Sequence, residues 1–160
     1  MPKYVDHAQR RREVTEVASR LVADEGRSAL TVRRVADAAS QSTTVVSHDF
    51  ADMAELLYET YQLAVRRSRT RIDRVLGHDP SDIIGLAEAL LPLDDERSTD
   101  WRIWLAFWSE ALGSPELAAE QRTGARTSAD RFRACLDALV ADGRARDDLD
   151  TRAAGNRVAA

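Results

Sequence analysis

One stretch of the sequence, residues 31–55, constrains the fold more than any other because it contains two short amphipathic patterns close together. In the first pattern, four apolar residues recur at the i, i+3, i+4, i+7 spacing of a half-buried helix: Val32, Val35, Ala36 and Ala39. Thr31 comes just before them, and its hydroxyl can cap the helix. The sequence therefore predicts a helix over residues 32–39.

Three polar residues, the last of which is Ser42, separate this helix from a second one. Ser42 can cap a short helix over residues 43–48, in which Val45 and Val46 point inward and the other side chains are polar. A helix, a tight turn and a short helix with a polar outer face form the helix-turn-helix pattern, whose second helix lies in the major groove of DNA. This stretch therefore predicts a DNA-binding domain.

The polar residues of these two helices are the candidates for contact with DNA. Arginine side chains bind phosphates and position a protein, whereas hydroxyl and amide groups can contact base edges. The candidates are Thr31, Arg33, Arg34, Gln41, Ser42, Thr43, Thr44, Ser47 and His48. Gln41 can read adenine if it points outward. For His48 the alternatives are a hydrogen bond at the helix end or partial burial, and its distance in sequence from His7 and His78 predicts no metal site.

An amphipathic helix that ends at Gly26 precedes the motif, and together they contain a recognisable set of residues. The set is Thr31, Val32, Val35, Ala36, Ser42, Thr43, Val45, Val46, Ser47, His48, Phe50, Glu55, Leu56 and Leu57. With it, residues 10–65 resemble the N-terminal domain of the TetR/AcrR family of bacterial transcriptional regulators. The resemblance implies an all-α fold: a three-helix helix-turn-helix domain over residues 1–52, and a helical ligand-binding and dimerisation domain over residues 53–160.

The sequence departs from the family pattern at four positions. The family usually has Gly and an apolar residue where this chain has Ser40 and Gln41, and a residue other than Gly in a left-handed turn costs about 1–2 kcal/mol. It usually has Tyr and Lys, which commonly contact phosphate, where this chain has Asp49 and Met53. We therefore expect the Asp49 carboxylate to repel phosphate and to weaken DNA binding.

Composition narrows the class of protein. The 160 residues are 44% hydrophobic and 31% charged, which excludes a disordered or membrane-embedded chain. No apolar run approaches the roughly 20 residues that span a bilayer, and the N-terminus has no apolar secretion core, so the expected location is the cytoplasm. The net charge is −4, but residues 1–75 hold 13 Lys and Arg against 11 Asp and Glu. A small basic excess therefore lies in the half with the helix-turn-helix, as DNA contact requires.

Caps, apolar stripes and stop residues predict the remaining helices, and no segment resembles a strand. Helix one is expected over residues 7–25, capped by Asp6, with Arg10–Arg12 either binding phosphate or forming a solvated charged turn. Later helices are expected over residues 53–76, from Asp79 and Pro80 to 91, from 99 or 100 to 113, over 115–142 and from 148–150 onward, with an acidic loop at 92–98. Cys135 falls on an apolar stripe, which predicts a buried thiol.

The second half resembles the BetI-type branch of the same family, through the segments WRIWLAFWSEAL and SPELAAEQR. That resemblance implies a small-molecule pocket and a dimer surface. Four aromatic side chains here can line an effector pocket or pack in the core, and tryptophans can also surround a quaternary ammonium group. They are Trp101, Trp104, Phe107 and Trp108. The family's last two helices build its dimer interface; because they are incomplete here, we expect a sequence truncated at its C-terminus or another mode of dimerisation.

These patterns predict a transcriptional regulator, a ligand-responsive repressor that binds double-stranded operator DNA as a homodimer and responds to a small-molecule effector. The alternative is a helical ligand-binding or protein-binding module of the same fold that has lost DNA binding, which Asp49, Met53 and the acidic net charge favour. No nucleophile with a base, metal-ligand cluster or glycine-rich phosphate loop is evident in the sequence. We therefore expect no enzymatic activity, no catalytic residue and no cofactor.

Overall fold

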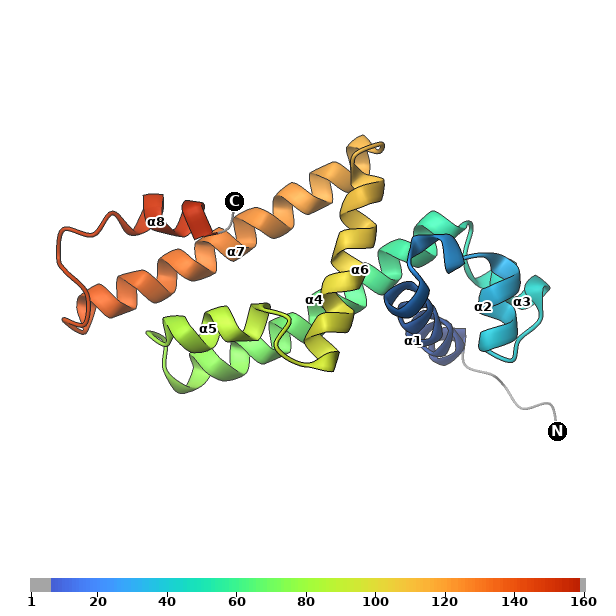
Figure 1. Ribbon diagram of the computed structural model, residues 1–160, viewed down its shortest axis with the longest axis horizontal. Coiled ribbons are helices and arrows are strands. Elements are labelled where there is room, and N and C mark those ends of the chain that lie inside the picture. Colours follow the sequence, from blue (N-terminus) through green and yellow to red (C-terminus); the bar gives the residue numbers. More distant parts are fainter. Residues whose placement is uncertain (1–6, 159–160) are drawn as a thin grey trace. The chain divides into compact units, whose positions relative to one another are not determined.

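The computed structural model describes residues 7–158, and this part of the chain contains helices and no strand (Figure 1). The elements are α1 (His7–Glu25), η1 (Arg27–Ala29), α2 (Val32–Ala38), α3 (Thr43–Asp49), α4 (Met53–His78), α5 (Ile83–Leu90), α6 (Asp95–Ala111), α7 (Pro115–Ala141) and α8 (Thr151–Val158). The predicted all-α fold is confirmed. The expected cap Asp6 lies outside the described residues. None of the described helices has both the length and the apolar character needed to cross a membrane.

The helices form two compact units. The first unit takes the chain up to Arg66 together with residues 94–107, so it contains α1 to α3, the first half of α4 and most of α6. The second unit takes residues 67–93 and the chain from Trp108 onward, which includes α5, α7 and α8. The domain boundary expected after residue 52 stays a prediction.

The core of the first unit draws apolar side chains from each of its helices. Its largest fully buried side chains are Val14, Val22, Leu30, Val35, Val46, Phe50, Leu56, Leu57, Ile103 and Phe107. The ring of Phe107 stacks on that of Tyr61, with centroids 3.8 Å apart and an interplanar angle of 9°. Each such side chain contributes about 1.5–3 kcal/mol to stability when fully buried. This core therefore holds the short elements η1, α2 and α3 in place.

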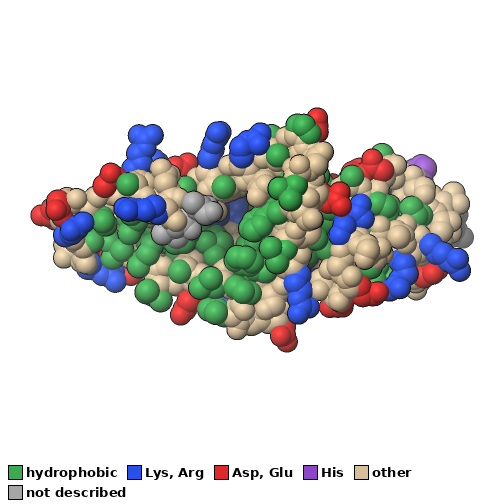
Figure 2. All heavy atoms as spheres, turned by 45° about the horizontal axis from the view of Figure 1, so that its top comes forward, with side chains coloured by type: hydrophobic (Ala, Val, Ile, Leu, Met, Phe, Trp, Pro, Cys, Tyr) green, Lys and Arg blue, Asp and Glu red, His purple; other side chains and the backbone are tan. Residues whose placement is uncertain are grey.

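The core of the second unit joins α4, α5 and α7 through Ile72, Leu86, Ala89, Phe132 and Cys135. The predicted burial of Cys135 is confirmed, and burial raises the pKa of its thiol. Apolar side chains also remain on the surface of this unit. In the view of Figure 2, hydrophobic side chains (green) gather on the surface. The large exposed ones in this unit are Ile84, Leu91, Leu93 and Leu112.

Acidic side chains cap the starts of α4, α5, α6 and α8, and of these the sequence predicted Asp52 at α4 and a start within residues 148–150 at α8. At the start of α4, Asp52 Oδ1 accepts a hydrogen bond from the Glu55 N–H at 2.8 Å, as expected. At α5 the prediction was wrong. Asp79 Oδ1 accepts from the Ser81 N–H at 2.9 Å, which makes a turn, and Asp82 instead caps the helix through the Gly85 N–H at 2.8 Å.

The acidic segment expected to be a loop is in part helical. Asp94 Oδ1 accepts a hydrogen bond from the Arg97 N–H at 2.8 Å and so caps α6, which begins at Asp95. Asp95 and Glu96 lie in the first turn, where the helix dipole favours negative charge. The acidic residues therefore start the helix. Likewise α4 continues through Gly77, its expected end, to His78.

Candidate nucleic-acid interface

The turn between α2 and α3 determines the direction in which α3 leaves. Ser40 has φ 52°, which makes it the one residue other than glycine with a left-handed backbone in the part of the chain that the structure describes. Its N–H donates to the Asp37 carbonyl at 3.2 Å, and the Gln41 N–H donates to the Ala36 carbonyl at 2.9 Å. This pair of bonds is the Schellman arrangement that ends a helix. The expected left-handed residue at position 40 is confirmed, at a cost of about 1–2 kcal/mol.

Two candidate DNA-binding residues serve as helix caps. Thr31 Oγ1 accepts a hydrogen bond from the Arg34 N–H at 3.3 Å, and Ser42 Oγ accepts one from the Val45 N–H at 3.2 Å. Both predicted caps are confirmed. Both residues are exposed, so each hydroxyl can still donate to an acceptor outside the protein.

α3 is divided into a buried face and an exposed polar face. Val46 is fully buried and Val45 is half-buried, as their inward direction predicted. Four residues of the helix are exposed and carry hydroxyl or imidazole groups: Thr43, Thr44, Ser47 and His48. Gln41, just before the helix, is half-buried. The structure therefore places the polar candidates of α3 together on its solvent-facing side.

The two arginines of α2 differ in their surroundings although both are exposed. Arg34 pairs with both carboxylate oxygens of Glu25, at 2.6 Å for Oε2. Within the described residues, Arg33 has no such ion-pair partner. Arg33 therefore carries the more available positive charge beside α3.

Asp49 lies at the end of α3 and points into the protein, so the expectation that it faces phosphate was wrong. Its side chain is 0% exposed. Arg10 from α1 donates from Nε to Oδ2 at 2.6 Å and from a terminal nitrogen to Oδ1 at 2.8 Å. These bonds lower the pKa of Asp49 to about 2. Asp49 follows Val46 by three residues, so it belongs to the inner face of the helix and cannot repel a phosphate on the outer face.

Arg11, the next residue of α1, connects this helix to α4 and to the end of α3. Its terminal nitrogen lies 2.9 Å from Glu55 Oε1 and 3.3 Å from Glu59 Oε1, both on α4. It also donates to the Asp49 carbonyl oxygen and lies 4.4 Å from the centroid of the Phe50 ring. Neither alternative expected for the arginine run describes Arg10 or Arg11, because both fasten α1 to its neighbours. Arg12 is exposed and donates to Gln9.

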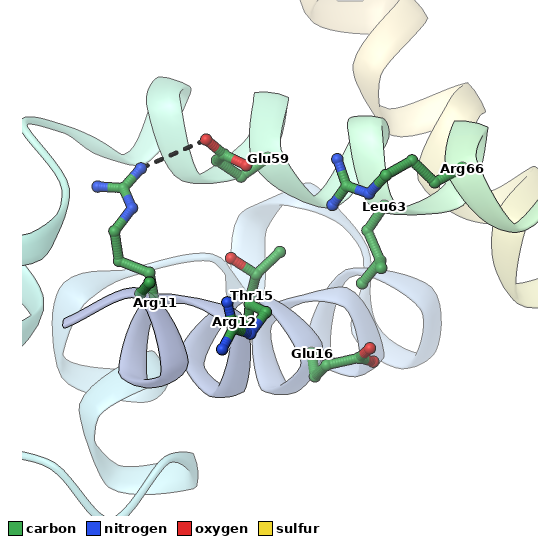
Figure 3. A pocket seen from close by; sticks show the side chains of 8 residues that line it. Arg11, Arg12, Thr15, Glu16, Glu59, Leu63 and Arg66 are labelled. Atoms are coloured by element: carbon green, nitrogen blue, oxygen red, sulfur yellow. Dashed lines mark hydrogen bonds and ion pairs between the residues drawn. The ribbon is translucent and has the colours of Figure 1, made fainter. Parts of the chain in front are cut away.

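A groove between α1 and α4 lies beside these ion pairs (Figure 3). It is lined by Ala8, Arg11, Arg12, Thr15, Glu16, Glu59, Leu63 and Arg66. Figure 3 shows the Arg11–Glu59 contact spanning the space between the two helices. The lining contains charges of both signs and no aromatic ring, so this groove differs in chemistry from the expected effector pocket.

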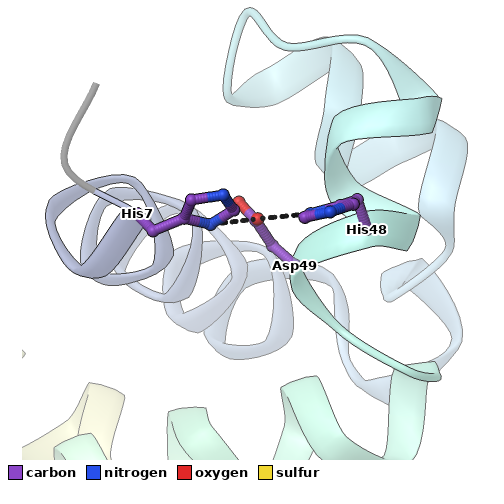
Figure 4. Close-up of side chains that lie close together, drawn as sticks. All are labelled: His7, His48 and Asp49. Carbon is purple, nitrogen blue, oxygen red and sulfur yellow. Dashed lines mark hydrogen bonds and ion pairs between the residues drawn. The ribbon is translucent and has the colours of Figure 1, made fainter. Parts of the chain in front are cut away.

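The separation of His7 and His48 in the sequence predicted no shared site, yet the structure places both beside Asp49 (Figure 4). Their ring centroids are 5.2 Å apart. His7 is the first residue of α1 and His48 is near the end of α3, so no local spacing connects them. Their meeting depends on the packing of α1 against α3.

The four aromatic candidates for ligand binding do not share one environment. Trp101, Trp104 and Phe107 belong to the first unit, whereas Trp108 belongs to the second. Phe107 is fully buried against Tyr61, so it packs in the core. Trp101 is half-buried and its ring lies 5.7 Å from that of Trp104, at 54°. Trp104 is buried, and the two rings contact each other as a tilted aromatic pair.

Known proteins with similar sequences agree with this fold and motif. Residues 14–60 match the model of bacterial regulatory proteins of the tetR family, and residues 83–160 match that of the BetI-type transcriptional repressor, C-terminal. Over 130 residues the chain is 30% identical to the HTH-type transcriptional regulator BetI of Paraburkholderia xenovorans, covering 79% of this chain and 67% of that protein. The chain belongs to the tetR family. Within the family it has the BetI-type C-terminal half that the sequence indicated.

Other tetR-family resemblances extend the comparison. The HTH-type regulator PksA of Bacillus subtilis is 26% identical over 114 residues, and the chain spans 56% of its length. A transcriptional regulator from Rhodococcus sp. Rha1 has a TM-score of 0.72 at 25% identity, covering 93% of this chain and 81% of that one. A regulator from Saccharomonospora viridis, in complex with choline, has a TM-score of 0.76 at 21% identity, covering 94% and 80%. The last shows a shared fold.

Proposed function

We propose that the protein is a ligand-responsive transcriptional repressor that binds double-stranded operator DNA as a homodimer in the cytoplasm. The observation that carries this proposal is the exposed polar face of α3, whose opposite face is fixed by Val46 in the core and by Asp49 on Arg10. A helix held rigidly from behind presents its outer side chains in a defined geometry, which is what sequence reading in the major groove requires.

Exposure and charge suggest which residues of α2 and α3 contact bases and which contact phosphate. Thr43, Thr44 and Ser47 offer hydroxyls that can meet base edges and methyl groups that can pack on thymine. Arg33 offers its charge to phosphate. A dimer would place two such heads about 34–36 Å apart, one helical turn of DNA, and the exposed apolar side chains of the second unit supply a surface for self-association.

The alternative, a module that has lost DNA binding, has less support than the sequence suggested. One of its reasons was a carboxylate at position 49 facing phosphate, and that carboxylate is buried on Arg10. Met53 remains as a position without charge, and it is half-buried. The relatives are transcriptional regulators, which also supports a regulator in preference to an enzyme.

The neighbouring arginines of α2 provide a test with an internal control. Replacing Arg33 with alanine is expected to lower the slope of log affinity against log salt concentration by about 0.9, the value for one lost phosphate contact. Arg34→Ala should change the slope much less, because Glu25 already neutralises that charge. Fluorescence anisotropy on duplexes enriched from a random library measures both. Absence of DNA binding by the unaltered, folded chain would contradict the function, whereas equal effects of the two variants would contradict only the role of Arg33.

For the effector we propose a small organic cation held by Trp101 and Trp104. The support is their tilted pairing, with centroids 5.7 Å apart, and the choline bound by the Saccharomonospora viridis regulator of the same fold. A ring that contacts a quaternary ammonium contributes about 0.5–2 kcal/mol, so Trp101→Leu should weaken choline binding roughly two- to thirty-fold in calorimetry. The uncharged isostere 3,3-dimethylbutan-1-ol should bind the unaltered protein more weakly. Equal binding of the two compounds, or no effect of Trp101→Leu, would exclude this site.

A further inference from the structure

Three side chains with metal-binding groups converge where the start of α1 meets the end of α3 (Figure 4). The Nδ1 atom of His7 lies 3.1 Å from Asp49 Oδ1, and the Nδ1 atom of His48 lies 3.4 Å from the same oxygen. All three ligand atoms lie within 4.8 Å of one another. The two imidazoles are 61% and 69% exposed, so an ion can enter from solvent and retain water as a further ligand.

These separations match those of a tetrahedral metal site. Zn²⁺ binds His nitrogen and carboxylate oxygen at about 2.0–2.2 Å, which places neighbouring ligand atoms of a tetrahedron about 3.3 Å apart. Both nitrogen–oxygen separations in the cluster are already close to that value. The cluster therefore needs adjustment mainly between the two imidazoles, whose exposed side chains can rotate. Two imidazoles and one carboxylate are also a ligand set that suits divalent first-row transition metals.

Arg10 is the group with which an ion must compete. Its terminal nitrogen lies 2.8 Å from Asp49 Oδ1 and 3.0 Å from His7 Nδ1, while its Nε lies 2.6 Å from Asp49 Oδ2. The two carboxylate oxygens of Asp49 can have different partners. Oδ2 keeps the hydrogen bond from Arg10 Nε, while Oδ1 binds the ion in place of the terminal nitrogen of Arg10. Arg10 then orients the ligating carboxylate, as outer partners of metal ligands do. Because its positive charge repels the ion, we expect micromolar affinity.

We propose that His7, His48 and Asp49 bind a divalent first-row transition-metal ion, represented by Zn²⁺, which links the first turn of α1 to the last turn of α3. The ion would join two helices whose cluster residues are 41 positions apart in the chain (His7 to His48), and so would stabilise the folded first unit. This proposal requires no DNA, and its test is therefore independent of the function proposed above.

The third histidine of the chain supplies a matched control. His78, at the end of α4, is exposed like the other two and belongs to the second unit. Full-length protein, freed of any affinity tag, would be titrated with Zn²⁺ against a chelating dye, using His7→Ala, His48→Ala and His78→Ala variants. We expect one ion per chain, at least a ten-fold loss of affinity in each of the first two variants, and no change in His78→Ala.

Co²⁺ gives a second readout, which reports on geometry. Visible absorption bands of tetrahedral intensity should appear with the unaltered chain and with His78→Ala, and should be lost in His7→Ala and His48→Ala. No thiolate charge-transfer band should appear, because Cys135 is not a ligand. Zn²⁺ should raise the melting temperature of the unaltered protein but not of the two cluster variants. No ion bound at micromolar concentrations, or equal binding in His7→Ala, His48→Ala and the unaltered chain, would overturn the proposal.

Discussion

Replacing Arg10 with alanine is expected to lower the free energy of unfolding by about 3 kcal/mol near neutral pH. The substitution removes both hydrogen bonds, at 2.6 and 2.8 Å, that the buried Asp49 carboxylate receives from the guanidinium. Breaking a buried pair costs about 3–5 kcal/mol, and the lower end applies because His7 and His48 still lie beside the carboxylate. Urea unfolding followed by helical circular dichroism measures the change.

The same pair makes the stability depend on pH. The ordinary pKa of 3.8 is lowered to about 2 in Asp49, chiefly by the hydrogen bonds from Arg10. Because the folded state has the lower pKa, this contribution is fully present above about pH 4 and is lost as the pH falls through about 2. It amounts to about 2 kcal/mol. Acidification should therefore destabilise the unaltered protein by about that much more than it destabilises Asp49→Asn.

Arg12 is the control for Arg10, since it lies on the same helix and is exposed. The hydrogen bond that the structure shows for it goes to Gln9. Arg12→Ala should change the free energy of unfolding by no more than about 0.5 kcal/mol. Equal losses in Arg10→Ala and Arg12→Ala would show that the inward pairing of Asp49 does not hold α3 in place.

Removing two hydroxyls from the exposed face of α3 is expected to abolish most of the sequence preference for DNA. Each lost base contact costs about 1–3 kcal/mol, so Thr44→Ala combined with Ser47→Ala should weaken binding to an enriched duplex by roughly thirty-fold or more. Binding to a scrambled duplex should change little, because phosphate contacts do not depend on these hydroxyls. Anisotropy titrations of both duplexes give the two affinities.

A hydroxyl of the second unit controls for this double variant. Thr127 is exposed on α7, in the second unit, and its Oγ1 donates to the Thr123 carbonyl. Thr127→Ala should leave both affinities unchanged. An unchanged preference in the Thr44→Ala, Ser47→Ala variant, with its melting temperature intact, would remove α3 from direct reading of bases.

Much of the first unit could be predicted because its determinants are local. Thr31, Ser42 and Asp52 each cap a helix through a residue three positions further on, and such contacts depend only on sequence spacing. The alternation of buried Val46 and exposed Ser47 likewise follows from helical periodicity. Prediction was weaker where two residues could cap the same helix. Asp79 and Asp82 could each cap α5, and in the structure Asp82 does so.

The features that escaped prediction depend on contacts between distant residues. Asp49 follows Val46 by three residues, a spacing that places both on the inner face of α3. The partner of Asp49, however, is Arg10, which is 39 residues away in the chain. The resemblance to a family with an exposed tyrosine at that position pointed in the opposite direction. The approach of His7 to His48 follows from that same packing of α1 against α3, so it could not be predicted before the Arg10–Asp49 pair was known.

We would first measure the ratio of dissociation constants for an enriched duplex and its scrambled counterpart at physiological salt, together with the mass of the protein in solution. If the polar face of α3 reads operator DNA, a dimer should bind the enriched duplex about a thousand-fold or more tightly than the scrambled one. A ratio near one, from a protein with an intact helical spectrum and melting transition, would contradict a sequence-reading head and favour the module that has lost DNA binding.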